Sequence, residues 1–119
     1  MQTASEYDAA YEKCTKESDT FNNNVVFGCS SLANDKARED ITRLYNSIYS
    51  HLRTQSSQDA RNFEASQKAW IKYRNYTCDL EGTYIGSPAF GICPMQMNAE
   101  RATYLRHFFQ DIGGAQEPK

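Results

Sequence analysis

The longest regular pattern of apolar positions in the chain covers residues 31–54. Apolar side chains recur there at intervals of three and four residues, which places them on one face of an α-helix. They are Ala33, Ala37, Ile41, Leu44, Tyr45, Ile48, Tyr49 and Leu52. The opposite face carries charges of both signs, which is typical of a helix surface in contact with water. The pattern therefore predicts a long amphipathic helix.

Three further segments have the same helical spacing. A short helix is predicted for residues 5–16, and a second long helix for residues 59–81, which ends at Gly82. The last predicted helix begins at Pro94, because proline is favoured as the first residue of a helix, and it ends at Gly113.

Polar and glycine-containing segments separate these helices. The asparagines at 22–24, followed by Gly28, interrupt the helical spacing after the first helix. Residues 55–58 form only a short turn, so the two long helices are predicted to be antiparallel neighbours. Residues 83–92 contain two glycines and a proline without helical spacing, and they are predicted to form a loop.

These elements define the predicted fold. The 119 residues suit one domain, residues 1–119, with residues 1–4 and 115–119 frayed at its ends. We expect an all-α fold, a small bundle of about four helices that includes two long antiparallel helices.

Aromatic and long polar side chains share the predicted helix at 59–81. One face carries Phe63, Gln67, Trp70, Arg74 and Cys78, and a stripe beside it carries Ala69, Tyr73, Tyr76 and Leu80. Because aromatic side chains at helical spacing are usually buried, we interpret Trp70, Tyr73 and Tyr76 as core residues rather than as a binding platform. Gln67 and Arg74 then need polar partners near the core, which we expect on the backbone of a loop or a neighbouring helix.

Composition narrows the class of partner. The chain has 13 lysines and arginines against 15 aspartates and glutamates, a formal charge of -2, so we expect no nucleic-acid partner. No apolar run is long enough for a transmembrane helix, and we expect no membrane insertion of the mature domain. The first residues lack the charged and apolar regions of a signal peptide, which leaves a cytosolic protein or one whose export signal has been removed.

The four cysteines, Cys14, Cys29, Cys78 and Cys93, suggest covalent stabilisation. Four cysteines allow three pairings, and the sequence alone does not choose among them. We favour the two local bridges, each of which would close a loop of about 15 residues and stabilise the fold by about 3 kcal/mol. The alternative is four free thiols in a cytosolic protein. The absence of any C-x-x-C spacing argues against a structural zinc site.

The sequence shows no catalytic motif. His51 and His107 are the only histidines, and neither accompanies a serine or cysteine in a nucleophile motif. Glu39 and Asp40 are adjacent, so they point to different sides of a helix and do not suit shared acid–base chemistry. We expect a protein that is not an enzyme and that uses no cofactor or metal.

Apolar side chains in the predicted loop are the best candidates for contact with a partner. Tyr84, Ile85 and Phe90 lie there together with Ser87, where no helical packing accounts for them. A loop fastened by the second cysteine pair would present these residues on a rigid scaffold. The alternative, which we consider equally good, is that they plug the end of the bundle.

The central segment resembles a known family. Residues 67–74 read Gln-Lys-Ala-Trp-Ile-Lys-Tyr-Arg and continue to Cys78, and downstream come Gly86-Ser87, Cys93 and Glu100-Arg101 with Leu105. Upstream, Ile41-Thr42 and Tyr45 are similar to that family's Leu-Asn and Tyr positions. Over about residues 29–105 the chain resembles the LprI-type family of exported bacterial proteins, which is named for a lysozyme inhibitor. The signature positions are Gln67, Trp70, Tyr73, Arg74 and Arg101.

The resemblance implies a small, mainly helical, disulfide-bonded domain that is periplasmic or lipid-anchored. The chain departs from the family pattern at two places. It has Thr42 where the family has asparagine, and it has Ile85-Gly86-Ser87 where the family has Gly-Gly-Ser. These departures affect the stiffness of the loop and leave the partner open. No inhibitory residue is carried over from the family.

The preferred hypothesis for function is a protein-binding inhibitor. It would be periplasmic or secreted, with its signal peptide removed, and it would use the 82–93 loop to inhibit a cell-wall lytic enzyme such as a lysozyme. The first alternative is an immunity protein that neutralises a toxin delivered into the periplasm, with a muramidase or another hydrolase as its partner. The second is a structural or stress-related envelope module without an enzyme target.

Overall fold

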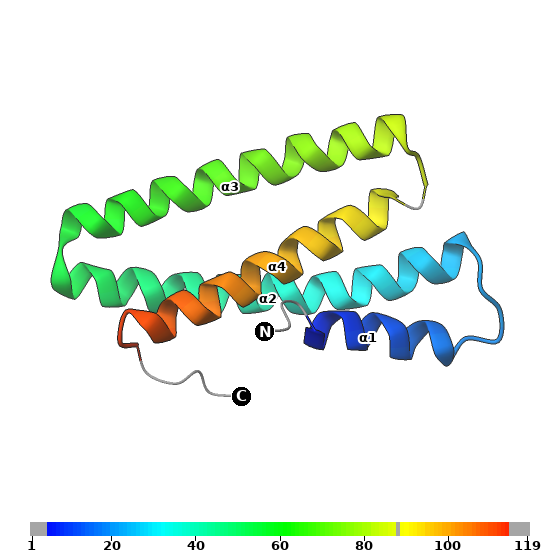
Figure 1. Ribbon diagram of the computed structural model, residues 1–119, viewed down its shortest axis with the longest axis horizontal. Coiled ribbons are helices and arrows are strands. Elements are labelled where there is room, and N and C mark those ends of the chain that lie inside the picture. The colour runs from blue at the N-terminus through cyan, green and yellow to red at the C-terminus, as the bar shows by residue number, and fades with distance from the viewer. Residues whose placement is uncertain (1–4, 88, 115–119) are drawn as a thin grey trace.

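The computed structural model describes residues 5–87 and 89–114, and these residues form four helices. In chain order they are α1 (Ser5–Lys16), α2 (Asn23–Gln55), α3 (Ser57–Tyr84) and α4 (Ala89–Asp111). The described ranges contain no strand, so the predicted all-α bundle is confirmed (Figure 1). The termini that we expected to fray, residues 1–4 and 115–119, lie outside the described residues.

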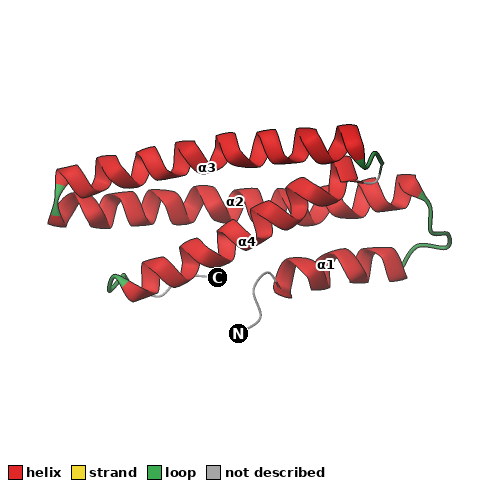
Figure 2. Ribbon diagram, turned by 45° about the horizontal axis from the view of Figure 1, so that its top comes forward, coloured by secondary structure: helices red, strands yellow, loops and turns green. Residues whose placement is uncertain are grey.

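Helix α2 is the centre of the bundle, because it contacts each of the other three helices. In both views α1 lies alongside the N-terminal half of α2, and α4 crosses α2 obliquely (Figures 1 and 2). The short turn between α2 and α3 is a single residue, Ser56. Its backbone N–H donates to the carbonyl of Leu52 and its side chain accepts from the N–H of Asp59, so one residue caps both helices. The two long helices are antiparallel, as predicted.

Helix α2 begins at Asn23, well before the predicted start at residue 31. The prediction was wrong because Asn22 caps the helix: its side-chain oxygen accepts a hydrogen bond from the N–H of Val25 at 3.0 Å. Gly28 lies inside the helix, where Val26 and Cys29 on either side of it are buried. Packing of these neighbours outweighs the low helix propensity of asparagine and glycine.

The predicted loop at 83–92 is shorter in the structure. Helix α3 continues to Tyr84 through Gly82, and the ring of Phe90 packs so closely against Gly82 that a Cβ atom there would overlap it. Helix α4 begins at Ala89, so Pro94 lies inside the helix and is not its first residue. Proline cannot donate the backbone hydrogen bond at that position, but the flanking turns are buried on one face and keep the helix continuous.

The core lies between α2 and α4. It receives Tyr7 from α1 and Phe63 from α3, and its buried members are Tyr7, Ala37, Ile41, Leu44, Ile48, Phe63, Ala99, Ala102 and Leu105. The predicted apolar faces of α2 and of the last helix are therefore confirmed. Helix α3 contributes little to this core, and between Gln67 and Gly82 it has no fully buried residue.

Three aromatic residues of α3, Trp70, Tyr73 and Tyr76, are not buried in the core, contrary to our interpretation. The side chains of Tyr73 and Tyr76 are exposed, and Trp70 is only partly buried at the edge of the core. Helical spacing identifies a shared face but not whether that face meets another element. Here α2 and α4 bury each other and leave this side of α3 uncovered.

Two disulfides tie the helices together in the local pairing that we favoured. Cys14–Cys29 joins α1 to α2, and Cys78–Cys93 joins α3 to α4, with Cα–Cα distances of 5.5 Å and 5.6 Å. Both distances lie in the normal range for a disulfide. The second bridge fastens the end of α3 that the core does not hold.

A buried polar network joins α1 to α2. The hydroxyl of Tyr7 donates to one carboxylate oxygen of Asp40 at 2.6 Å, and Arg43 donates to the other at 2.6 Å. Arg106 of α4 lies 3.6 Å from the same carboxylate. Burial alone would raise the pKa of Asp40, but the hydrogen bonds from Tyr7 and Arg43 outweigh it and hold that pKa below its usual value. Burial and the bond to Asp40 raise the pKa of Tyr7.

Candidate functional site

A groove of about 900 Å³ runs between α2, α3 and α4. It exists because α3 carries partly buried polar and aromatic side chains, rather than fully buried aliphatic ones, between Gln67 and Gly82. Side chains that line it include Asn34, Arg38 and Tyr45 from α2, Gln67, Trp70 and Arg74 from α3, and Phe90 and Asn98 from α4. The groove thus combines an aromatic wall with amide and guanidinium groups.

Four of the five signature positions meet at one place beside this groove. The guanidinium groups of Arg74 and Arg101 lie 5.2 Å and 5.3 Å from the centre of the Trp70 ring, within the range of cation–π attraction. Arg101 also donates from Nε to the side-chain oxygen of Gln67 at 3.0 Å. Tyr73 is the exception, because its side chain is 62% exposed.

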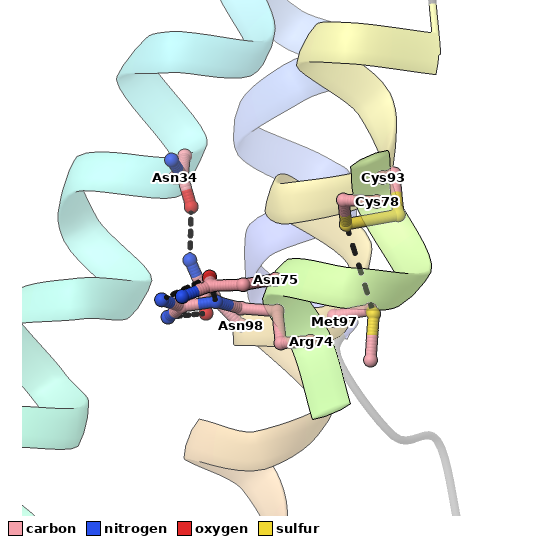
Figure 3. The surroundings of a disulfide bond; sticks show 7 residues. All are labelled: Asn34, Arg74, Asn75, Cys78, Cys93, Met97 and Asn98. Carbon is pink, nitrogen blue, oxygen red and sulfur yellow. Dashed lines mark hydrogen bonds between the residues drawn. A yellow bond between two sulfur atoms is a disulfide. The ribbon is translucent and has the colours of Figure 1, made fainter. Parts of the chain in front are cut away.

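Arg74 belongs to a chain of side-chain hydrogen bonds that crosses the bundle (Figure 3). Its Nη1 donates to the Oδ1 of Asn98 at 3.1 Å, and the Nδ2 of Asn98 donates to the Oδ1 of Asn34 at 2.6 Å. Its Nε and Nη2 both donate to Asn75. We expected Gln67 and Arg74 to bind backbone groups, but both are paired with side chains of α3 and α4.

Asn98 and Asn34, which carry this chain from α4 to α2, were not predicted as site residues from the sequence. Asn98 is only 2% exposed, between the buried residues Met95 and Ala99. A polar residue on an otherwise apolar helix face is a signal that could have been used, since a buried amide needs partners. Near the same site the sulfur of Met97 lies 3.8 Å from the Sγ atom of Cys78, next to the disulfide (Figure 3).

The arginines at the groove lack acidic partners. In the part of the chain that the structure describes, no carboxylate lies within ion-pair distance of Arg38, Arg74 or Arg101. Burial lowers the pKa of Arg74, and the positive charge of Arg38 lowers it further. Burial likewise lowers the pKa of Arg101, whose Nη2 atom is buried without a hydrogen-bond partner among the described residues. The groove is lined by Arg38, Lys68 and Arg74 and by Glu64 and Asp79, so its lining has one more positive than negative charge, although the chain as a whole is slightly acidic.

The candidate contact residues are at the surface where α3 and α4 join. Tyr84 is 83% exposed, Ile85 68% and Phe90 58%, and Ser87 is also exposed. We call these four residues the tip surface. Their exposure suits a contact surface better than a plug of the bundle, except that Phe90 also packs against the bundle, and their contact with a partner remains a prediction. Phe90 has two roles, because it also covers Gly82 and lines the groove.

A second exposed surface continues the tip surface along α3. Tyr73, Tyr76, Leu80 and Tyr84 follow one another at spacings of three and four residues, so they form one stripe on the helix. All four are more than half exposed. Tyr84 belongs to both surfaces, which makes the exposed apolar area continuous at the tip.

The described residues do not assemble a metal centre. No group of three or more histidine, cysteine, aspartate and glutamate side chains comes together there in a way that could hold a metal ion. His51 has a structural contact, since its Nε2 lies 3.1 Å from the carbonyl oxygen of Ile112. None of the described helices combines the length and apolar character needed to cross a bilayer.

Comparison with known proteins identifies the family. The family model described as lysozyme inhibitor LprI matches residues 7–105, which is most of the chain. No curated protein and no solved structure shows significant similarity to it. The matched range includes both disulfides, the groove and the tip surface. The family is one of inhibitors and not of enzymes, and this chain belongs to the LprI lysozyme inhibitor family.

Proposed function

We propose that the protein inhibits a lysozyme-type enzyme of the bacterial cell wall by placing its tip surface against that enzyme. Family membership supports the class of target. The observation that carries the mode of binding is the exposure of Tyr84, Ile85 and Phe90 at a turn that the Cys78–Cys93 disulfide fastens. Tyrosine and other aromatic residues at the centre of a contact supply a large share of binding energy in protein complexes.

The tip surface and the stripe together suit a protein partner better than a small ligand. A stable protein interface buries about 800 Å² on each partner. Tip residues alone would supply only part of that area, at roughly 150–250 Å² for each large aromatic side chain. The adjoining stripe on α3 extends the apolar area in the direction of Tyr73. Exposed apolar patches of this extent on a small protein mark contact sites.

We further propose that the protein works in the periplasm or outside the cell. Both disulfides are intact in the structure, and such bonds persist in oxidising compartments. Lysozyme-type enzymes act on the cell wall, in the same compartments. With a formal charge of -2, the protein offers only weak long-range attraction to a cationic enzyme, so contact residues must provide most of the affinity.

An inhibition assay tests this function directly. The oxidised protein is incubated with lysozymes of several structural types, and lysis of cell-wall substrate is followed together with complex formation by size-exclusion chromatography. We expect inhibition of at least one type with formation of a complex. Absence of both inhibition and complex at micromolar concentrations, with every enzyme type, would contradict the proposal.

A further inference from the structure

Three cationic side chains line the groove, and one of them, Lys68, lies 3.7 Å from the carboxylate of Glu64. The other two, Arg38 and Arg74, face the groove without an ion pair among the described residues. Arg38 comes from α2 and Arg74 from α3, both line the groove, and they are close enough for the charge of one to affect the pKa of the other. No carboxylate of the described residues pairs with either of them. Two like charges held together on different helices are unfavourable unless an anion lies between them.

The guanidinium group of Arg74 is held in a fixed position at the groove. Asn98 and Asn75 accept hydrogen bonds from its guanidinium group, and the Trp70 ring supports it from 5.2 Å. These contacts are all to neutral groups, so they orient the guanidinium without neutralising it. Arg38 is exposed, and its side chain makes no hydrogen bond or ion pair within the described part of the chain, so it is free to turn towards a ligand.

We propose that this groove binds a small carboxylate that carries an apolar or aromatic body. Its carboxylate would lie between Arg38 and Arg74, and its body would lie against Trp70, Ile71 and Phe90, which line the same groove. The planar guanidinium group matches a carboxylate with two parallel hydrogen bonds. A volume of about 900 Å³ is within the range of small-molecule sites.

Acidic residues at the groove limit the charge of the ligand. Glu64 and Asp79 also line it, at positions before and after Arg74 along α3. Their negative charges oppose a ligand with several anionic groups spread along the groove, such as a polyphosphate. A single carboxylate between the arginines avoids this repulsion. The groove shares Phe90 with the tip surface, but Tyr84, Ile85 and Ser87 do not line it.

Trp70 makes the proposal measurable, because it is the only tryptophan in the chain and it lines the groove. The full-length oxidised protein is titrated with 3-phenylpropionate, with its neutral amide, 3-phenylpropionamide, and with inorganic phosphate at constant ionic strength. Tryptophan fluorescence and the NMR shift of the Trp70 indole N–H are the two readouts. We expect a saturable change with the acid at millimolar concentrations, and at least tenfold weaker binding of the amide and of phosphate.

Charge-matched variants locate the site. Arg38→Gln should weaken binding of the acid about tenfold or more, as expected for the loss of a charge-assisted hydrogen bond. Arg61→Gln is the control: it removes the same charge from an exposed position on α3 outside the groove, and it should leave binding unchanged. Circular dichroism of both variants checks that they remain folded.

Several results would overturn the proposal. They are the absence of a saturable change in both readouts, equal binding of the acid and the amide, equal binding of phosphate and the acid, and equal loss of affinity in the two folded variants. The first three results would show that the groove does not select a carboxylate with an apolar body. The last would show that the ligand does not bind beside Arg38. Each is independent of whether the protein inhibits lysozyme.

Discussion

Asp40 shows how one carboxylate can link three helices. It accepts hydrogen bonds from Tyr7 and Arg43 and is only 7% exposed. Its pKa is lower in the folded protein than in the unfolded chain, whose aspartates titrate at about 3.9. The ionised form therefore stabilises the fold above that pH, and this contribution is lost as the pH falls through the lower, folded pKa.

Asp40→Asn should lower the free energy of unfolding at pH 7 by about 2 kcal/mol, because it weakens the charge-assisted hydrogen bonds that the buried carboxylate accepts from Tyr7 and Arg43. The stability of the variant should also depend less on pH between about 5 and 2 than that of the wild type. Urea unfolding followed by circular dichroism over this range is the measurement. Asp35→Asn, at an exposed position on the same helix, is the control. Parallel pH profiles for the wild type and Asp40→Asn would contradict the assignment.

Trp70 lies at the edge of the core, and its substitution should cost less than that of a central residue. Trp70→Ala should lower the free energy of unfolding by about 2 kcal/mol, below the roughly 3–5 kcal/mol typical of a fully buried aromatic residue. Leu105→Ala, at a fully buried site, should cost more. Urea unfolding by circular dichroism compares the two. If Trp70→Ala were the more damaging, the ring would be a central core element.

Helix α3 is anchored mainly at its two ends. Phe63 packs into the core near its start, and the Cys78–Cys93 bridge holds it near its end. Between these points its inward side meets the groove, and its outer side carries the exposed stripe. Its C-terminal half should therefore depend on the disulfide more than α2 does.

Replacing both Cys78 and Cys93 by alanine should cost about 3 kcal/mol of stability, the value expected for a closed loop of this length. Hydrogen exchange should rise mainly in residues 68–84 and much less in α2, because opening is local where few side chains are buried. Exchange followed by mass spectrometry on peptides is the measurement. Replacing Cys14 and Cys29 instead should affect α1. A uniform rise throughout the chain would show that α3 is not a separate weak unit.

The sequence predicts where the helices lie and which of their faces are apolar better than it predicts how the helices contact one another. The bounds of α1 and the apolar face of α2 follow from local spacing, and the disulfides pair cysteines at equal separation. The early start of α2 depends on one cap, Asn22, which a run of three asparagines conceals. Tyr73 and Tyr76 are exposed because no other helix packs against them. The hydrogen bonds that link Arg74 through Asn98 to Asn34 join three helices. The spacing of residues along one helix predicts neither feature, because both depend on how the helices pack together.

For the whole molecule, the packing of α2 against α4 leaves α3 available for binding. One of its sides forms the groove and another carries the stripe that ends at the tip surface. The exposure of the tip residues was predictable from the sequence, because apolar side chains accompany glycines and a proline there. The groove was not recognisable, because its residues come from three helices.

The most direct test of a contact at the tip surface is the inhibition constant against a lysozyme that the wild-type protein inhibits. It is measured for the variants Tyr84→Ala and Phe21→Ala. Both residues are large, aromatic and at least 70% exposed, but Phe21 lies in the connection between α1 and α2. We predict that Tyr84→Ala raises the inhibition constant about tenfold or more, with an unchanged melting temperature, and that Phe21→Ala changes neither value. Equal inhibition by Tyr84→Ala and the wild type, or an equal loss in both variants, would contradict a contact at the tip surface.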